Sequence, residues 1–148
     1  MSNQSIHNNE SVKKIAHIGI AVQSLETSLP FYRDVLKMNV EAIEIVDSEK
    51  VKVAFLKIGD THLELLEPID DSSPIQSFIN KRGEGIHHIA LEVDDIEKRL
   101  DTMRENGIKL INEVPKDGAG NAKIAFLHPK STNGVLYELC QYEKGSDK

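Results

Sequence analysis

Short runs of apolar and β-branched residues recur along the chain, as is typical of buried strands. The two clearest runs, residues 17–22 and 88–93, each lead into an amphipathic stretch that predicts a helix. Three more strands are expected after each helix. Their ranges are 40–46, 51–58 and 62–66 in the first half and 109–113, 123–127 and 135–140 in the second. Each half of the chain therefore predicts the order βαβββ.

The helix boundaries follow from capping residues. In the second half, Asp94 or Asp95 can cap a helix over 96–106, because a short polar side chain there accepts a free backbone N–H. In the first half Ser24 has the same place, but Pro30 makes that helix less regular and leaves Ser28 as an alternative start.

The two halves repeat one design. Residues 17–26 align with 88–97 without a gap, and Val-Ala-Phe-Leu at 53–56 matches Ile-Ala-Phe-Leu at 124–127. Such self-similarity indicates two copies of one supersecondary unit. We therefore expect a single domain over 14–142. It comprises a module 14–68, a linker 69–84 that contains a short helix and a module 85–142, with a flexible N-terminal tail at 1–13 and a C-terminal tail at 143–148.

Strand alternation places four polar residues on matching faces. Side chains at positions i and i+2 share a face, so His17 lies with Gly19 and Ala21, while the larger apolar residues lie opposite. His88 has the equivalent place in the second module. Glu64 and Glu138 occupy equivalent positions in the last strand of each module.

Polar residues that recur at matched positions within apolar strands need a common explanation, because buried polar groups must be paired or metal-bound. Two imidazoles and two carboxylates suit one divalent cation such as Co²⁺, Ni²⁺, Zn²⁺, Mn²⁺ or Fe²⁺. We therefore predict that His17, Glu64, His88 and Glu138 hold one such ion per chain. Four protein ligands would leave positions open in an octahedral site, which favours catalysis.

Composition narrows the classes of function. The chain has 148 residues, 39% of them hydrophobic and 28% charged, which is an ordinary globular balance. Its net charge of -6 argues against nucleic acid as a partner. No apolar run approaches the roughly 20 residues that span a bilayer. The polar start lacks the apolar core of a secretory signal, and the single cysteine, Cys140, fits a reducing cytoplasm.

The sequence resembles the vicinal oxygen chelate superfamily, which includes glyoxalase I, extradiol dioxygenases, fosfomycin-resistance proteins and methylmalonyl-CoA epimerases. The resemblance covers about residues 14–141 and is closest to the epimerases. It rests on five stretches, which are His-Ile-Gly-Ile-Ala-Val at 17–22, Glu-Leu-Leu-Glu-Pro at 64–68, Gly-Glu-Gly-Ile-His-His-Ile-Ala at 83–90, Phe-Leu-His-Pro-Lys at 126–130 and Gly-Val-Leu-Tyr-Glu-Leu at 134–139. It implies an α+β fold in which two tandem βαβββ modules form a cupped mixed sheet around one metal. It also implies a homodimer.

The resemblance implies a reaction at C2 of methylmalonyl-CoA, an acyl-CoA substrate. The C2 proton moves through a metal-stabilised enolate, so that the (2R) and (2S) forms interconvert. Glu138 is the candidate for one of the two proton-transfer groups. Some epimerases have a glutamate where this chain has Val53, which cannot transfer a proton, so His62 is a second, weaker candidate. In the same resemblance His88 is the ligand of the His87-His88 pair, and His87 points toward the helices.

The loop over 116–123 is a candidate substrate gate, with Lys123 and Asn121 as possible substrate-binding residues. An ordinary hairpin loop with a solvated lysine is the alternative interpretation. Two other functions remain open. One is a glyoxalase I-type lactoylglutathione lyase, which uses similar ligands on a thiol hemithioacetal. The other is a binding protein of the same fold without catalysis, although such proteins typically lack the four ligands.

Overall fold

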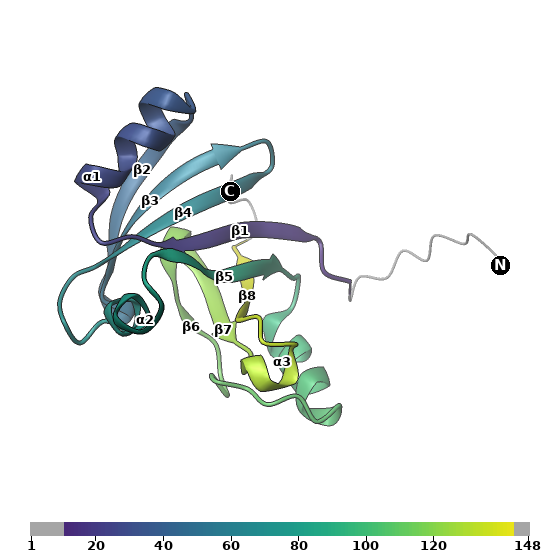
Figure 1. Ribbon diagram of the computed structural model, residues 1–148. Coiled ribbons are helices and arrows are strands. Elements are labelled where there is room, and N and C mark those ends of the chain that lie inside the picture. The colour runs from purple at the N-terminus through teal and green to yellow at the C-terminus, as the bar shows by residue number, and fades with distance from the viewer. Residues whose placement is uncertain (1–10, 144–148) are drawn as a thin grey trace.

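The computed structural model describes residues 11–143, which form one eight-stranded mixed sheet in the order β2-β3-β4-β1-β5-β8-β7-β6 (Figure 1). The strands are β1 (Lys14–Ala21), β2 (Asn39–Val46), β3 (Val51–Ile58), β4 (Thr61–Pro68), β5 (Gly85–Glu92), β6 (Lys116–Asp117), β7 (Ala122–Phe126) and β8 (Tyr137–Tyr142). The helices are α1 (Leu25–Leu29), α2 (Pro74–Arg82) and α3 (Ile96–Glu105). The tails predicted at 1–13 and 143–148 lie largely outside the described residues.

The sheet has two equivalent halves that meet at the antiparallel pair β1 and β5 (Figure 1). In each half the first strand pairs in parallel with the last strand, β1 with β4 and β5 with β8. In these registers Gly19 lies beside Glu64, and Ala90 lies beside Glu138. The expected fold of two βαβββ modules forming a cupped mixed sheet is confirmed. Its symmetry brings equivalent positions of the two modules to the centre.

Helices α1 and α3 cover the outer face of the sheet, where large apolar side chains gather. Leu25 and Leu29 of α1 pack on Leu56 and Leu65 of the first half. Ile96 and Leu100 of α3 are the equivalent residues in the second half, and they pack with apolar residues of β7 and β8. Because α1 and α3 lie on the outer face, the inner face of the curved sheet is left for a cavity. Helix α2 borders this cavity, since its Ile75 packs with Val53 and Leu66 of the inner face.

A proline directly follows the first helix, α1, and begins the next helical segment. Ser24 caps α1 by accepting a hydrogen bond from the N–H of Thr27, as predicted, so the alternative start at Ser28 is wrong. Helical backbone then continues as a π-helical segment, Pro30–Val35. Proline has no N–H to donate to the preceding turn, which accounts for the change of helical pattern at Pro30.

The strand predicted at 109–113 is not formed. Only Leu110 makes an isolated bridge, to Leu127, and the second strand of this module is the two-residue β6 instead. The side chain of Asn112 takes the place of a ladder partner, because its Oδ1 accepts the N–H of Phe126 at 2.8 Å. The apolar pattern of this segment reflects packing around Leu110, which belongs to the core beside α3.

No helix in the part of the chain described is long and apolar enough to cross a membrane.

Candidate metal centre and active site

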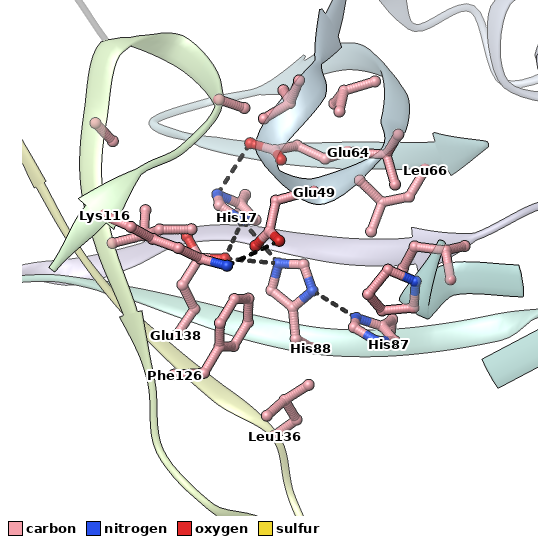
Figure 2. Close-up of a pocket in the computed structure, with 18 of the residues that line it drawn as sticks. His17, Glu49, Glu64, Leu66, His87, His88, Lys116, Phe126, Leu136 and Glu138 are labelled. Atoms are coloured by element: carbon pink, nitrogen blue, oxygen red, sulfur yellow. Dashed lines mark hydrogen bonds and ion pairs between the residues drawn. The ribbon is translucent and has the colours of Figure 1, made fainter. Parts of the chain in front are cut away.

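A cavity of about 240 Å³ opens on the inner face of the cupped sheet, between the two modules (Figure 2). Its walls are mostly apolar, with Val53 and Leu66 from the first module and Ile124 and Phe126 from the second. The polar side chains that line it are His17, Glu49, Glu64, His87, His88, Asn112, Lys116, Glu138 and Tyr142. An apolar pocket with a few converging polar groups is the usual form of a small-molecule site.

The four predicted ligands all lie at the floor of this cavity, and each is only about 5% exposed. His17 Nε2 lies 3.0 Å from His88 Nε2, and His88 Nε2 lies 3.1 Å from Glu138 Oε1. The distance from His17 Nε2 to Glu138 Oε1 is 3.7 Å. Glu64 contacts the opposite nitrogen of the same ring, with its Oε2 3.0 Å from His17 Nδ1. Three donors therefore converge, and Glu64 supports the ring of one of them from behind.

The spacing of the three converging donors fits a metal ion. Donors held about 2.1 Å from a cation are separated by about 3.0 Å in an octahedral site and about 3.4 Å in a tetrahedral one. The separations of 3.0, 3.1 and 3.7 Å among His17, His88 and Glu138 span those values. These three residues form a group that could hold a metal ion. Two imidazole nitrogens that face one another across 3.0 Å also need a shared proton or cation between them.

The electrostatics of the cluster favour positive charge at its centre. Burial lowers the pKa of His17, but the carboxylates of Glu64 and Glu138 outweigh it and raise that pKa to about 10. Glu138 is likewise buried, which raises its pKa, yet the neighbouring His17 and His88 hold it well below the usual range. The Nδ1 atom of His17 has no well-aligned hydrogen bond although Glu64 is near. Two carboxylates thus stabilise a cation at this point.

Gly19 is required for the position of His88. A Cβ atom built on Gly19 would lie 2.3 Å from Cε1 of the His88 ring and 2.6 Å from its Nδ1. The imidazole therefore lies flat over the backbone of β1, in space that only glycine leaves. This finding extends the expectation that small residues follow His17 to leave room for a cleft.

A β-bulge in β5 gives His87 an unexpected direction. The register of β1 and β5 passes from Gly19–His88 to Ile20–Ile86, so His87 has no direct partner. A bulge of this kind changes the direction of a side chain, and bulges are common beside active sites. The ring of His87 packs on Phe78 of α2 and lines the cavity, with its Nδ1 3.0 Å from His88 Nδ1. The expectation that His87 points away from the site, toward the helices of the apolar face, is therefore wrong.

Three other predicted residues lie outside the lining of the cavity. His62 is on the correct face of β4 but one position farther out, where its Nε2 contacts Glu41 Oε1 at 2.7 Å. Lys123 is 60% exposed and pairs with Asp117. Asn121 is exposed and has left-handed backbone at φ 60°.

Two charged residues that the sequence reasoning did not select do line the cavity. Glu49 and Lys116 form an ion pair of 3.0 Å between Oε2 and Nζ, close to the histidine cluster (Figure 2). Lys116 belongs to the loop that was predicted as a gate, in which Lys123 was the residue selected. No sequence signal distinguished Glu49 from the other acidic residues around it.

Comparison with known proteins identifies the family. Residues 16–126 match the glyoxalase/bleomycin resistance protein/dioxygenase superfamily. The mitochondrial methylmalonyl-CoA epimerase of Dictyostelium discoideum is 41% identical over 86% of this chain and 78% of its own length. A probable lactoylglutathione lyase of Synechocystis is 29% identical over 90% of this chain and 98% of its own.

A solved structure agrees with the sequence comparison. A variant of the Streptomyces coelicolor methylmalonyl-CoA epimerase, in complex with 2-nitronate-propionyl-CoA, has a TM-score of 0.88 and 34% identity, covering 93% of this chain and all of the other. The agreement extends over both modules and therefore includes the strands that supply the cluster. The chain thus belongs to the glyoxalase/bleomycin resistance protein/dioxygenase superfamily and, within it, to the family of the methylmalonyl-CoA epimerases.

Proposed function

We propose that this protein interconverts the (2R) and (2S) forms of methylmalonyl-CoA by proton transfer at C2. The observation that carries the proposal is the convergence of His17, His88 and Glu138 at the floor of an apolar cavity. The similarity to epimerases over nearly the whole chain supports the choice of substrate.

Three of the four predicted ligands, His17, His88 and Glu138, would hold a divalent cation, whereas Glu64 lies at the opposite nitrogen of the His17 ring. When bound, the cation supplies Lewis-acid stabilisation of negative charge that develops on the substrate oxygens. The candidates are Co²⁺, Ni²⁺, Zn²⁺, Mn²⁺ and Fe²⁺, since imidazole and carboxylate ligands suit all five. Glu64 also holds the His17 ring from its far side, so it contributes to the position of that ligand.

Glu138 is the proposed group that exchanges the C2 proton on one face of the substrate. Its carboxylate is buried in β8, and its pKa is held low, so it is present as the ionised form that a base requires. The cavity wall beside this proton transfer is apolar and includes Val53, Leu66 and Phe126. General acid–base assistance of this kind contributes about 10²- to 10⁴-fold in rate.

Deuterium exchange tests the proposal. Cation-loaded protein is incubated with methylmalonyl-CoA in D₂O, and incorporation of deuterium at C2 is followed by NMR. We expect rapid exchange that a chelator abolishes. For the epimer whose C2 proton faces Glu138, Glu138→Gln should reduce exchange by at least 100-fold. Absence of exchange by protein that holds a cation would reject the substrate. Methylglyoxal with a thiol would then be tested, as for a lactoylglutathione lyase.

The same assay tests His62. If His62 donates the second proton, His62→Ala slows exchange or inversion strongly. Its contact with Glu41 outside the cavity lining supports normal turnover instead.

We also propose that the protein is a cytoplasmic homodimer. The only cysteine, Cys140, is buried as a free thiol, which suits a reducing compartment. Sedimentation equilibrium tests the dimer, and a single species of monomer mass at micromolar concentration would reject it.

A further inference from the structure

Inversion at C2 requires two proton-transfer groups, one for each face of the substrate. Glu138 provides one in the function proposed above, on which this inference rests. The second group is missing from the expected place, because Val53 has no proton to give and His62 lies outside the cavity lining. The structure must supply it from another residue.

Glu49 is the one carboxylate of the cavity lining that has no contact with the histidine cluster among the described residues. Three carboxylates line the cavity there, and the other two, Glu64 and Glu138, contact His17. Glu49 lies in the turn Asp47–Glu49 that follows β2, and its side chain is 22% exposed. Figure 2 shows its carboxylate directed into the cavity beside the histidines.

Glu49 and Glu138 come from different walls of the cup. The turn that holds Glu49 joins β2 and β3 in the first module, whereas β8 holds Glu138 in the second module. A planar intermediate that lies between the two modules would therefore present one face to each carboxylate. This is the arrangement that inversion requires.

Lys116 gives Glu49 a source of protons and a fixed position. Its Nζ is 3.0 Å from Glu49 Oε2, and its side chain is 36% exposed, so it can exchange protons with water. The loop that holds Lys116 is fixed on the first module by two hydrogen bonds. Ser48 Oγ donates to the carbonyl of Asp117 at 3.2 Å, and the N–H of Gly120 donates to Glu44 Oε1 at 3.0 Å.

We propose that Glu49 is the second proton-transfer residue and that Lys116 positions it and restores its proton. In one direction Glu138 removes the C2 proton, and the electron pair of the broken C–H bond is delocalised into the thioester carbonyl. Glu49 then forms the new C–H bond on the other face with a proton drawn from the Lys116 ammonium group. Lys116 regains a proton from water, and Glu138 loses one to water, so the protons balance. In the reverse direction Glu49 is the base and Glu138 the acid.

The test separates exchange from inversion, starting from each pure epimer in D₂O. For Glu49→Gln we expect inversion to fall at least 100-fold. For the epimer whose C2 proton faces Glu138, the exchange rate should stay within about tenfold of wild type, with retained configuration. For the other epimer, exchange should be lost. A structural defect would slow both epimers equally. Glu49→Asp should restore part of the inversion, because it retains a carboxylate.

Asp47→Asn is the matched control, since it removes an exposed carboxylate from the same turn without altering the cavity lining. Inversion within a few-fold of wild type in Glu49→Gln would overturn the proposal. Equal loss of exchange from both epimers, or a higher KM with an unchanged kcat, would also overturn it and make Glu49 a binding or structural residue. If the wild-type protein exchanges neither epimer, the proposed function fails and this inference falls with it.

Discussion

The fit of His88 over Gly19 allows a prediction whose size follows from the structure. In Gly19→Ala the new Cβ would lie 2.3 Å from Cε1 of His88, about 1 Å inside ordinary contact. The backbone of β1 cannot yield, because Gly19 is paired on both sides, with Glu64 in β4 and with His88 in β5. The imidazole must therefore move by about 1 Å, which is half of a metal–nitrogen bond of about 2.1 Å.

We expect Gly19→Ala to lower cation affinity by at least 100-fold, because a displacement of about 1 Å removes one converging donor. Stability should fall by about 1–3 kcal/mol through overpacking. Isothermal titration with Co²⁺ and thermal unfolding measure the two effects separately. Gly59→Ala is the control, since Gly59 lies in open space with φ +54° and should cost about 1–2 kcal/mol without altering cation binding. Co²⁺ affinity within a few-fold of wild type in Gly19→Ala would refute the assignment of His88 as a ligand.

Three further predictions concern the cluster. Because the pKa of His17 is raised to about 10, the metal-free cluster holds a proton at pH 7.5 that a cation must displace. Calorimetry in buffers of different ionisation enthalpy should find about one proton released per ion bound. Cation affinity should rise with pH up to about 10. Cation binding without proton release would contradict this prediction. Glu64→Gln should keep cation affinity within about tenfold but reduce the proton release, because the carboxylate that raises the His17 pKa is lost; unchanged release would be inconsistent with that cause. His87→Phe should keep the packing on Phe78 but lower cation affinity about 10- to 100-fold, because His88 Nδ1 loses its partner. Competition with a fluorescent chelator measures the cation affinity. Unchanged affinity would reject a supporting role for His87.

The neutral state of His87 is consistent with that last prediction. Burial and the neighbouring His88 lower the pKa of His87 to about 4. A neutral ring can accept the Nδ1 proton of His88, which leaves His88 Nε2 free to face the cation.

The sequence predicted the modules and the four polar residues at the cavity floor because both depend on local periodicity. Alternation fixes the face of a side chain within a strand, so the positions of His17 and Glu138 could be inferred without tertiary information. The repeat then related the two modules. These inferences need only the order of residues along the chain, without tertiary contacts.

What the sequence could not supply depends on contacts between distant segments. The bulge at His87 arises from the register of β5 against β1, which alternation alone does not predict. The segment 109–113 has the composition of a strand, but its pairing is reduced to one bridge, and the side chain of Asn112 takes the N–H of Phe126. The loop of Lys116 is fixed on the first module by contacts that the sequence does not reveal, and the sequence reasoning selected the more exposed Lys123 instead.

The central claim is cation-dependent inversion at C2, and one measurement tests it most directly. A single pure epimer of methylmalonyl-CoA is incubated with Co²⁺-loaded protein, and the appearance of the other epimer is followed by an enzyme that consumes only that form. The structure predicts conversion to a near-equal mixture, loss of conversion when a chelator removes the ion, and recovery when the ion is restored. Persistence of the starting epimer with protein that has been shown to hold one ion per chain would contradict the account.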